Sequence, residues 1–423
     1  MESESYLADL FRKEMNKSKD PRMIREAEFD VGYPTGYLAF DFSNGMKIKV
    51  EIKEENKIFF YNSIGITDGS MISVVGRSGC GKTTLVKQWA GNIVKPFPNA
   101  MIMDEELEAG SSAQKKRQLM NMTEEEFAKK YVPRNQGITT ENFFARIKAL
   151  HDLKINNRDI YEYDTGYYDP SGNRIYKLQP SVVILDSLAM LMPEDLTSEG
   201  KDGGEIAGSM AITSVAKVNT QLVKRVIPML KAANILWFVI NHILPDPSPV
   251  PKKAQVAWLK IGERCPGGET AIYLANNFIR VNDSSKLSAE KDLGINGINV
   301  ELELVKSRTN RPGITVPMIL DYDKGFNKEL SLYALLKKHN RINGAGAYLY
   351  IGEHSEHKFS QKKIMEKLQE PEFAQIFMDE VFDVLELLIN TSTIVTEDVD
   401  TEPKVDITSM MLQSMQEKLS MCA

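Results

Sequence analysis

The stretch SMISVVGRSGCGKTTLVKQWA, from Ser70 to Ala90, carries the residues whose types and spacing most strongly predict chemistry. An apolar run over 71–75 precedes a glycine-rich loop over 76–81, and Lys82-Thr83-Thr84 then opens a helical pattern. This is the G-x-x-x-x-G-K-[ST] phosphate-binding loop, in the strand–loop–helix context that the motif requires. The sequence therefore predicts a nucleotide triphosphate site.

Each residue type in this loop has a physical task. Glycines let the backbone curl so that successive N–H groups point at one anion, and the following helix adds its positive dipole end. Lys82 supplies a charge for the β- and γ-phosphates, and the Thr83 hydroxyl can ligate Mg²⁺. We therefore expect ATP and Mg²⁺ as cofactors. The expected nucleotide contacts are Gly76, Arg77, Ser78, Gly79, Cys80, Gly81, Lys82, Thr83 and Thr84, with Tyr322 farther along the chain.

Carboxylates follow two other apolar runs. The apolar run over 181–185, SVVIL, is followed by Asp186, which is expected to hold Mg²⁺ together with Thr83. Residues 100–103 are followed by Asp104, Glu105 and Glu106. Because open α/β sheets bind ligands at the carboxyl ends of their strands, these acids are well placed for chemistry beside the phosphate loop.

The composition is that of an ordinary soluble protein. The chain has 423 residues, of which 42% are hydrophobic and 26% charged, and its net charge of −6 excludes a global basic field for nucleic acid, although local patches could still bind it. The N-terminus is too acidic and polar for a signal peptide, and no apolar run reaches the length of a membrane span. Three separated cysteines fit a reducing cytosol, so we expect a cytoplasmic protein with no membrane partner.

Repeated alternation of strand and helix patterns predicts an α/β fold with a mostly parallel twisted sheet and helices on both faces. Hairpin signals occupy 46–61 and 158–178, helical patterns occupy 111–150 and 209–232, and further strands are expected at 235–240, 271–281 and 297–305. We predict a short helical, oligomerising segment over 1–32, a core over 33–328, a small α+β domain over 329–390 and an acidic tail over 391–423.

Over residues 33 to 390 the chain resembles the RecA recombinase family, and its bacteriophage UvsX-type branch in particular. The resemblance rests on the ordered set GRSGCGKTT, MDEE, VVILDS, FVINH, a Gly267-Gly268 pair, VKSR and GAGAYLYIG. It implies a RecA-like P-loop ATPase core and an enzyme that hydrolyses ATP in a DNA-dependent reaction. A phage origin would place the protein in an infected bacterial cell.

The resemblance also implies catalytic roles beside that of Lys82. Glu106 matches the glutamate that orients or deprotonates the attacking water. His242 stands where the family has a residue that senses the γ-phosphate. Lys306 and Arg308 match a pair of cations inserted into the neighbouring subunit's ATP site, where they would act as an arginine finger does. Each could instead be an ordinary solvated or structural side chain.

The resemblance assigns DNA binding to two loops, about 194–210 and 244–268. Basic residues there would hold phosphates without reading sequence, and an aromatic ring among them suits base stacking. The residues expected to contact DNA are Lys217 and Lys224, on the helix after the first loop, and Lys252, Lys253, Trp258, Lys260, Arg264, Gly267 and Gly268 in the second. The second loop is rich in proline and differs from the bacterial proteins.

We therefore expect an ATP-dependent recombinase that forms helical filaments on single-stranded DNA and pairs it with homologous double-stranded DNA. Its implied partners are both forms of DNA, further copies of itself, a single-strand-binding protein and a loader. A hexameric helicase with the same core is the alternative enzyme. A non-enzymatic regulator that uses ATP as a switch is the third reading, although such a protein has no need of Glu106, Asp186, Lys306 and Arg308 together.

Overall fold

The structure is a computed structural model, and it describes residues 30–52, 57–108, 110–133, 138–169, 172–197, 209–246, 259–266, 270–289, 292–346 and 348–391. The helix expected near the N-terminus and the acidic tail lie outside these residues. Within the described residues, no helix combines the length and the apolar character that a membrane span requires.

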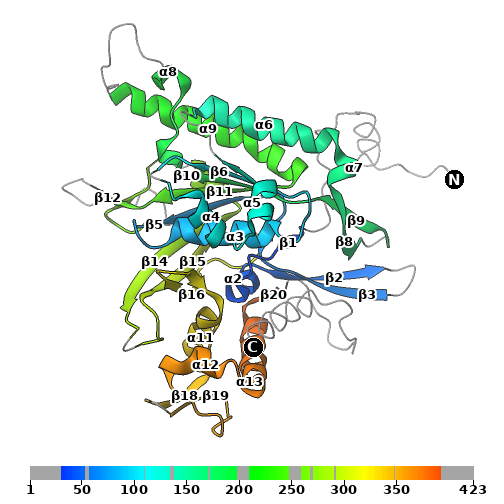
Figure 1. The fold of residues 1–423 in the computed structure, drawn as a ribbon. Helices are drawn as coiled ribbons and strands as arrows, with labels where there is room; N and C mark the ends of the chain where they lie inside the picture. Colours follow the sequence, from blue (N-terminus) through cyan, green and yellow to red (C-terminus); the bar gives the residue numbers. More distant parts are fainter. Residues whose placement is uncertain are drawn as a thin grey trace, which may run out of the picture.

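Within the described residues, a nine-stranded sheet has the order β17-β16-β15-β14-β5-β11-β10-β6-β7 (Figure 1). The strands from β14 to β7 all run parallel, and β15, β16 and β17 continue the sheet in antiparallel fashion. The strands span Met71–Gly76 (β5), Ile102–Glu106 (β6), Tyr131–Pro133 (β7), Ser181–Asp186 (β10), Ile235–His242 (β11), Asn277–Leu287 (β14), Gly297–Lys306 (β15), Ile314–Asp321 (β16) and Gly325–Asn327 (β17). This confirms the expected α/β fold with a mostly parallel sheet.

Apolar side chains on both faces explain why the central strands are buried. In β10, Val182 and Ile184 face one core cluster while Val183 and Leu185 face another, as the two-residue period of a strand requires. The first face is covered by α3 (Lys82–Val94), which buries Trp89. The second is covered by α6 (Thr140–Asn156) and α9 (Ser209–Ala233), which lie side by side above the sheet in Figure 1. The sheet is therefore the middle layer of three.

Smaller elements surround these layers. The expected hairpins form as β2 (Met46–Ile52) with β3 (Lys57–Ser63), and as β8 (Glu162–Tyr168) with β9 (Arg174–Leu178). Their aromatic rings touch, since the Tyr61 and Tyr167 ring centres are 4.5 Å apart. The remaining elements before β14 are β1 (Gly32–Tyr33), α2 (Leu38–Ser43), β4 (Ile66–Thr67), α4 (Ala113–Leu119), α5 (Glu124–Lys130), α7 (Arg158–Tyr161), α8 (Glu194–Thr197), β12 (Leu244–Pro245), β13 (Glu263–Arg264) and α10 (Thr270–Leu274).

The chain after the sheet forms the lower part of the molecule in Figure 1. It contains α11 (Lys328–Lys338), β18 (Ile342–Ala345), β19 (Tyr348–Ile351), α12 (Ile364–Lys367), α13 (Pro371–Leu388) and β20 (Asn390–Thr391). Asn390 pairs with Met46, so β20 joins the edge of the first hairpin. This mixture of helix and strand is the composition expected for the segment, while the proposed domain boundaries stay predictions.

Local differences from the sequence-based expectations have physical reasons. Residues 271–274, expected to begin a strand, form α10, whose Ala271 and Ile272 pack into the core. Residues 194–197, expected in a loop, form α8. The acids of 104–106 form the carboxyl end of β6 as expected, but they are buried there, and lysine and arginine side chains neutralise them.

Candidate nucleotide-binding site

The phosphate loop contains two residues whose backbone angles glycine adopts more readily than any other residue. β5 ends at Gly76 and α3 begins at Lys82. Gly79 and Gly81 have φ angles of +80° and +92°, in the left-handed region that favours glycine. A Cβ at Gly79 would meet nothing within 4 Å, whereas one at Gly81 would come within 2.8 Å of a Leu320 methyl carbon. The loop is therefore open where phosphates would bind and tightly packed where it joins the helix.

Lys82 is buried and held by the loop itself. Its Nζ donates to the carbonyl oxygens of Arg77, at 2.8 Å, and Gly76, at 3.1 Å. Nδ1 of His242 lies 3.4 Å from the same Nζ. These contacts place the ammonium group within the concave side of the loop, where it can meet a phosphate.

Thr83 and Asp186 supply a pair of oxygen atoms beside the loop. Thr83 Oγ1 donates to Asp186 Oδ2 over 2.6 Å. Burial raises the pKa of Asp186, which the hydrogen bond from Thr83 partly offsets. Hydroxyl and carboxylate oxygens are ligands that Mg²⁺ prefers, so the residues fit this ion. No group of three or more His, Cys, Asp or Glu could hold a metal in the described part of the chain, so phosphates and water would have to complete the coordination.

A pocket of about 360 Å³ adjoins these groups. Predicted contacts that line it are Ser78, Gly79, Gly81, Lys82, Thr83, Thr84, His242 and Tyr322. Residues that line it and were not anticipated are Glu108, Lys115, Leu119, Leu320, Asp321 and Gly325. The half-exposed ring of Tyr322 and the apolar side chains of Leu119 and Leu320 give the pocket an apolar part that suits a nucleobase.

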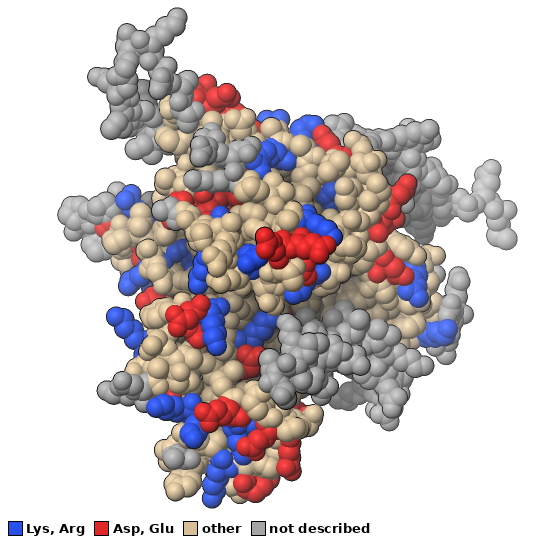
Figure 2. Space-filling model, in the orientation of Figure 1, with Lys and Arg blue, Asp and Glu red and all other residues tan. Residues whose placement is uncertain are grey.

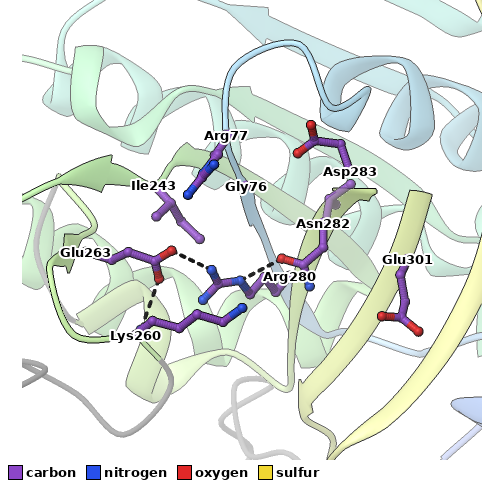
Figure 3. Close-up of a pocket in the computed structure, with 10 residues that line it drawn as sticks. Gly76, Arg77, Ile243, Lys260, Glu263, Arg280, Asn282, Asp283 and Glu301 are labelled. Carbon is purple, nitrogen blue, oxygen red and sulfur yellow. Dashed lines mark hydrogen bonds and ion pairs between the residues drawn. The ribbon is translucent and has the colours of Figure 1, made fainter. Parts of the chain in front are cut away.

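Gly76 and Arg77 line a second cavity of about 300 Å³ (Figure 3). Its floor is an ion pair between Arg280 and Glu263, 2.7 Å apart, with Arg280 also donating to Asn282 at 2.9 Å. Cys80 is buried, and its thiol contacts the Arg77 carbonyl oxygen at 2.9 Å. Among the described residues, the predicted contacts Gly76, Arg77 and Cys80 therefore do not line the nucleotide pocket.

Glu106 takes part in a buried ion network. Nζ of Lys87 and Nζ of Lys116 each lie 2.8 Å from its Oε2, and its side chain is 7% exposed. Although burial by itself raises a carboxyl pKa, the hydrogen bonds from Lys116 and Lys87 outweigh it, and the pKa of Glu106 is lowered. Among the described residues, the lining of the nucleotide pocket includes Glu108 but not Glu106.

Glu108 and His242 meet inside the nucleotide pocket. His242 Nε2 lies 2.9 Å from Glu108 Oε1, which also accepts a hydrogen bond from Ser187 Oγ at 3.1 Å. The position of His242 follows from the strand order, because β11 lies between β5, which ends at the phosphate loop, and β10, which ends at Asp186. The sequence gives one signal for Glu108: it is a further carboxylate two residues beyond Glu106, where β6 ends.

Lys306 and Arg308 lie away from this pocket. Lys306, the last residue of β15, pairs with Phe278 near the start of β14, and its Nζ donates to the Tyr273 carbonyl oxygen at 2.6 Å. Burial, with the charge of Arg308, lowers the pKa of Lys306. Phe278 precedes Val281, the partner of Gly76, by three positions, roughly 10 Å along the strand. The two cations therefore stand at the amino end of the parallel strands, whereas the phosphate loop follows their carboxyl end.

The predicted DNA contacts are divided between surface elements. Lys217 and Lys224 are exposed on α9, and seven residues, nearly two helical turns, separate them. Lys260 and Arg264 are exposed around β13, which pairs with β12 just beyond His242. Lys252, Lys253, Trp258, Gly267 and Gly268 lie outside the described residues.

Comparisons with known proteins agree on the type of fold. The model of the phosphoribulokinase / uridine kinase family matches residues 71–199. The energy-coupling factor transporter ATP-binding protein EcfA1 of Fusobacterium nucleatum is 24% identical over 224 residues, which are 50% of this chain and 76% of that protein. A crystal structure of the RadB recombinase aligns with 62% of this chain and 92% of its own, at 15% identity and a TM-score of 0.36. With the phosphate loop and the parallel sheet, the kinase-family match and the similarity to EcfA1 show a P-loop NTPase fold.

Proposed function

We propose that this protein is an ATP-dependent DNA recombinase of the RecA type, which assembles into helical filaments on single-stranded DNA and catalyses homologous pairing and strand exchange. Its ATP site would be completed by a neighbouring copy of the chain. The observation that carries the proposal is the placement of Lys306 and Arg308 at the far edge of the sheet from their own phosphate loop.

Two cations so placed cannot reach the nucleotide of their own subunit. In a head-to-tail assembly they would stand at the surface that meets the next subunit, where a cation supplied in trans stabilises charge on the transferring phosphoryl group. Arg308 is exposed, as this role requires. Hydrolysis would then depend on assembly, which couples ATP turnover to the filament.

The route from nucleotide to DNA is short. His242 lines the nucleotide pocket, β12 begins two residues later, and Leu244 of β12 pairs with Arg264 of β13, near Lys260. Glu263, between these cations, is tied to Arg280 of β14. A shift of His242 on nucleotide binding would therefore reach a segment whose exposed cations suit DNA phosphates.

DNA binding would have to be local. On the face drawn in Figure 2, basic and acidic side chains alternate and no single basic field dominates. This agrees with the net charge of −6. A strand held by a few lysines and arginines would bind through phosphate neutralisation without sequence preference, which is what a general recombinase needs.

The test is ATP hydrolysis and strand exchange by the purified full chain, with and without single-stranded DNA. We expect single-stranded DNA to stimulate hydrolysis and homologous strands to exchange, with both activities lost in Lys82→Ala. An ATP hydrolysis rate that does not change when single-stranded DNA is added would contradict the proposal. Transfer of the γ-phosphate to a small hydroxylated acceptor would instead indicate a kinase, the class named by the family model that matches residues 71–199.

A further inference from the structure

Two glutamates near the end of β6 have opposite surroundings. Glu106 accepts hydrogen bonds from two ammonium groups and belongs to a network that includes Asp104, whose Oδ2 lies 3.1 Å from Lys116 Nζ and accepts from Tyr131 at 2.8 Å. Lys87 is itself fully buried on α3. A carboxylate held this way fastens α3 and α4 to β6 and is a weak base, because its pKa is lowered.

Glu108 has the surroundings that Glu106 lacks. Its side chain is 37% exposed and lines the nucleotide pocket together with Lys82 and Thr83. Ser187, which follows Asp186 directly, donates to it. Glu108 therefore lies just beyond the end of β6 and lines the nucleotide pocket, whereas Glu106, the strand partner of Asp186, does not line it.

The donor and acceptor roles in the hydrogen bonds that join Lys82, His242 and Glu108 can be assigned. A lysine ammonium group can only donate, so His242 Nδ1, 3.4 Å from Lys82 Nζ, is the acceptor. The proton of a neutral imidazole then lies on Nε2 and is donated to Glu108 Oε1, 2.9 Å away. Glu108 Oε1 thus accepts hydrogen bonds from both His242 and Ser187, and these two bonds fix the orientation of its carboxyl group.

We propose that Glu108, rather than Glu106, is the carboxylate that activates the attacking water. His242, which contacts both Lys82 and Glu108, is then the positioning residue that orients the Glu108 carboxylate. The inference rests on the proposed ATPase activity. As the water oxygen bonds to the γ-phosphorus, Glu108 takes a proton from the water. The bond from the γ-phosphorus to the bridging oxygen breaks, its electron pair stays on ADP, and Glu108 then passes the proton to phosphate or solvent.

The experiment compares steady-state ATP hydrolysis and binding of a fluorescent ATP analogue in full-length variants. Glu108→Gln should lower kcat by about 100-fold or more, the usual contribution of a general base, while analogue affinity changes by less than about threefold. Glu106→Gln should lower the thermal midpoint and reduce kcat by less than about tenfold. Glu125→Gln, an exposed carboxylate on α5, is the matched control and should leave both quantities unchanged.

The role of His242 has its own readout. A glutamine amide can accept from Lys82 and donate to Glu108, so His242→Gln should retain kcat within about tenfold, whereas His242→Leu should lose it as Glu108→Gln does. Wild-type turnover in Glu108→Gln, or a loss confined to a folded, ATP-binding Glu106→Gln, overturns this inference alone. A wild-type chain that hydrolyses no ATP, with or without DNA, overturns the ATPase proposal as well.

Discussion

Thr83 Oγ1 and Asp186 Oδ2 lie 2.6 Å apart, although 103 positions separate the two residues in the sequence. The contact exists because β11 alone separates β5 from β10 in the sheet, so that the phosphate loop and the end of β10 meet at the carboxyl ends of the parallel strands. Lys306 and Arg308 stand at the opposite, amino end of these strands. The site thus combines groups that one chain brings together with cations that only a second chain could add.

The Thr83–Asp186 pair should be needed for catalysis with Mg²⁺. Thr83→Val keeps the shape of the side chain and removes the hydroxyl, so we expect kcat to fall by about 100-fold or more and the Mg²⁺-dependent gain in ATP affinity to disappear. Thr83→Ser retains the hydroxyl and should keep most of the activity. ATP titrations with and without Mg²⁺ check this; equal Mg²⁺ dependence in Thr83→Val and the wild type would remove Thr83 from the metal site.

Lys306 and Arg308 should act on the neighbouring subunit. The double variant with alanine at both positions should lose about 1,000-fold in hydrolysis, as the loss of an arginine finger does. An equal mixture with Lys82→Ala should recover about a quarter of the wild-type rate, because one junction in four then joins an intact loop to intact cations. ATPase assays on such mixtures measure the recovery.

The mixing experiment has a clear contrary result. If the mixture stays inactive while each variant still binds DNA and assembles, the cations do not complement a neighbour's site. Activity of the double variant on its own would show that Lys306 and Arg308 are ordinary surface cations.

Lys217 and Lys224 should contribute to DNA binding through phosphate contacts. Replacing both with alanine should weaken binding to single-stranded DNA of any sequence and reduce the slope of log K against log salt by about 1.4, or 0.7 for each contact. Fluorescence anisotropy at several salt concentrations measures the slope. Lys129→Ala, on exposed α5, is the control with an unchanged slope; the same slope in the double variant would exclude the α9 lysines from the DNA site.

Lys154 should make stability depend on pH. It is buried, and burial lowers its pKa to about 7, while its Nζ donates to the carbonyl oxygens of Gln179 and Asn234. Between about pH 7 and pH 10 the folded protein has released this proton and the unfolded chain still holds it, so stability should rise with pH.

The Lys154→Met variant isolates this effect. Relative to it, the wild type should gain about 1 kcal/mol of unfolding free energy for each pH unit between 7 and 9. Urea unfolding of both proteins at pH 7, 8 and 9 measures the difference. A constant difference across this range would show that Lys154 keeps its proton in the folded protein.

Sequence reasoning predicted the parts of the site that local patterns encode. The phosphate loop and the β10 run ending in Asp186 can each be recognised from a few consecutive residues, and the two hairpins follow from the alternation of apolar and polar residues around a turn. The choice between Glu106, the last residue of β6, and Glu108, just beyond it, could not be predicted, because no local pattern shows which side chains each one meets. Only the fold brings Lys87 and Lys116 to Glu106, and Ser187 and His242 to Glu108.

The burial of charged residues could not be predicted from local sequence patterns either. The acids of 104–106 form the carboxyl end of β6 as predicted, but their burial was not, since isolated carboxylates are not expected inside a protein. They are buried because Arg146 of α6 lies 2.9 Å from Glu105 while lysines from α3 and α4 meet Asp104 and Glu106. Such compensation between distant segments has no signature in a single sequence.

Assembly on DNA is the most direct test of the proposed recombinase. The full-length protein would be imaged by electron microscopy with single-stranded DNA, Mg²⁺ and a slowly hydrolysed ATP analogue. We expect open helical filaments that coat the DNA, with Lys306 and Arg308 of one subunit facing the phosphate loop of the next. Closed six-membered rings would favour a helicase, and unassembled monomers on the same DNA would contradict the shared ATP site.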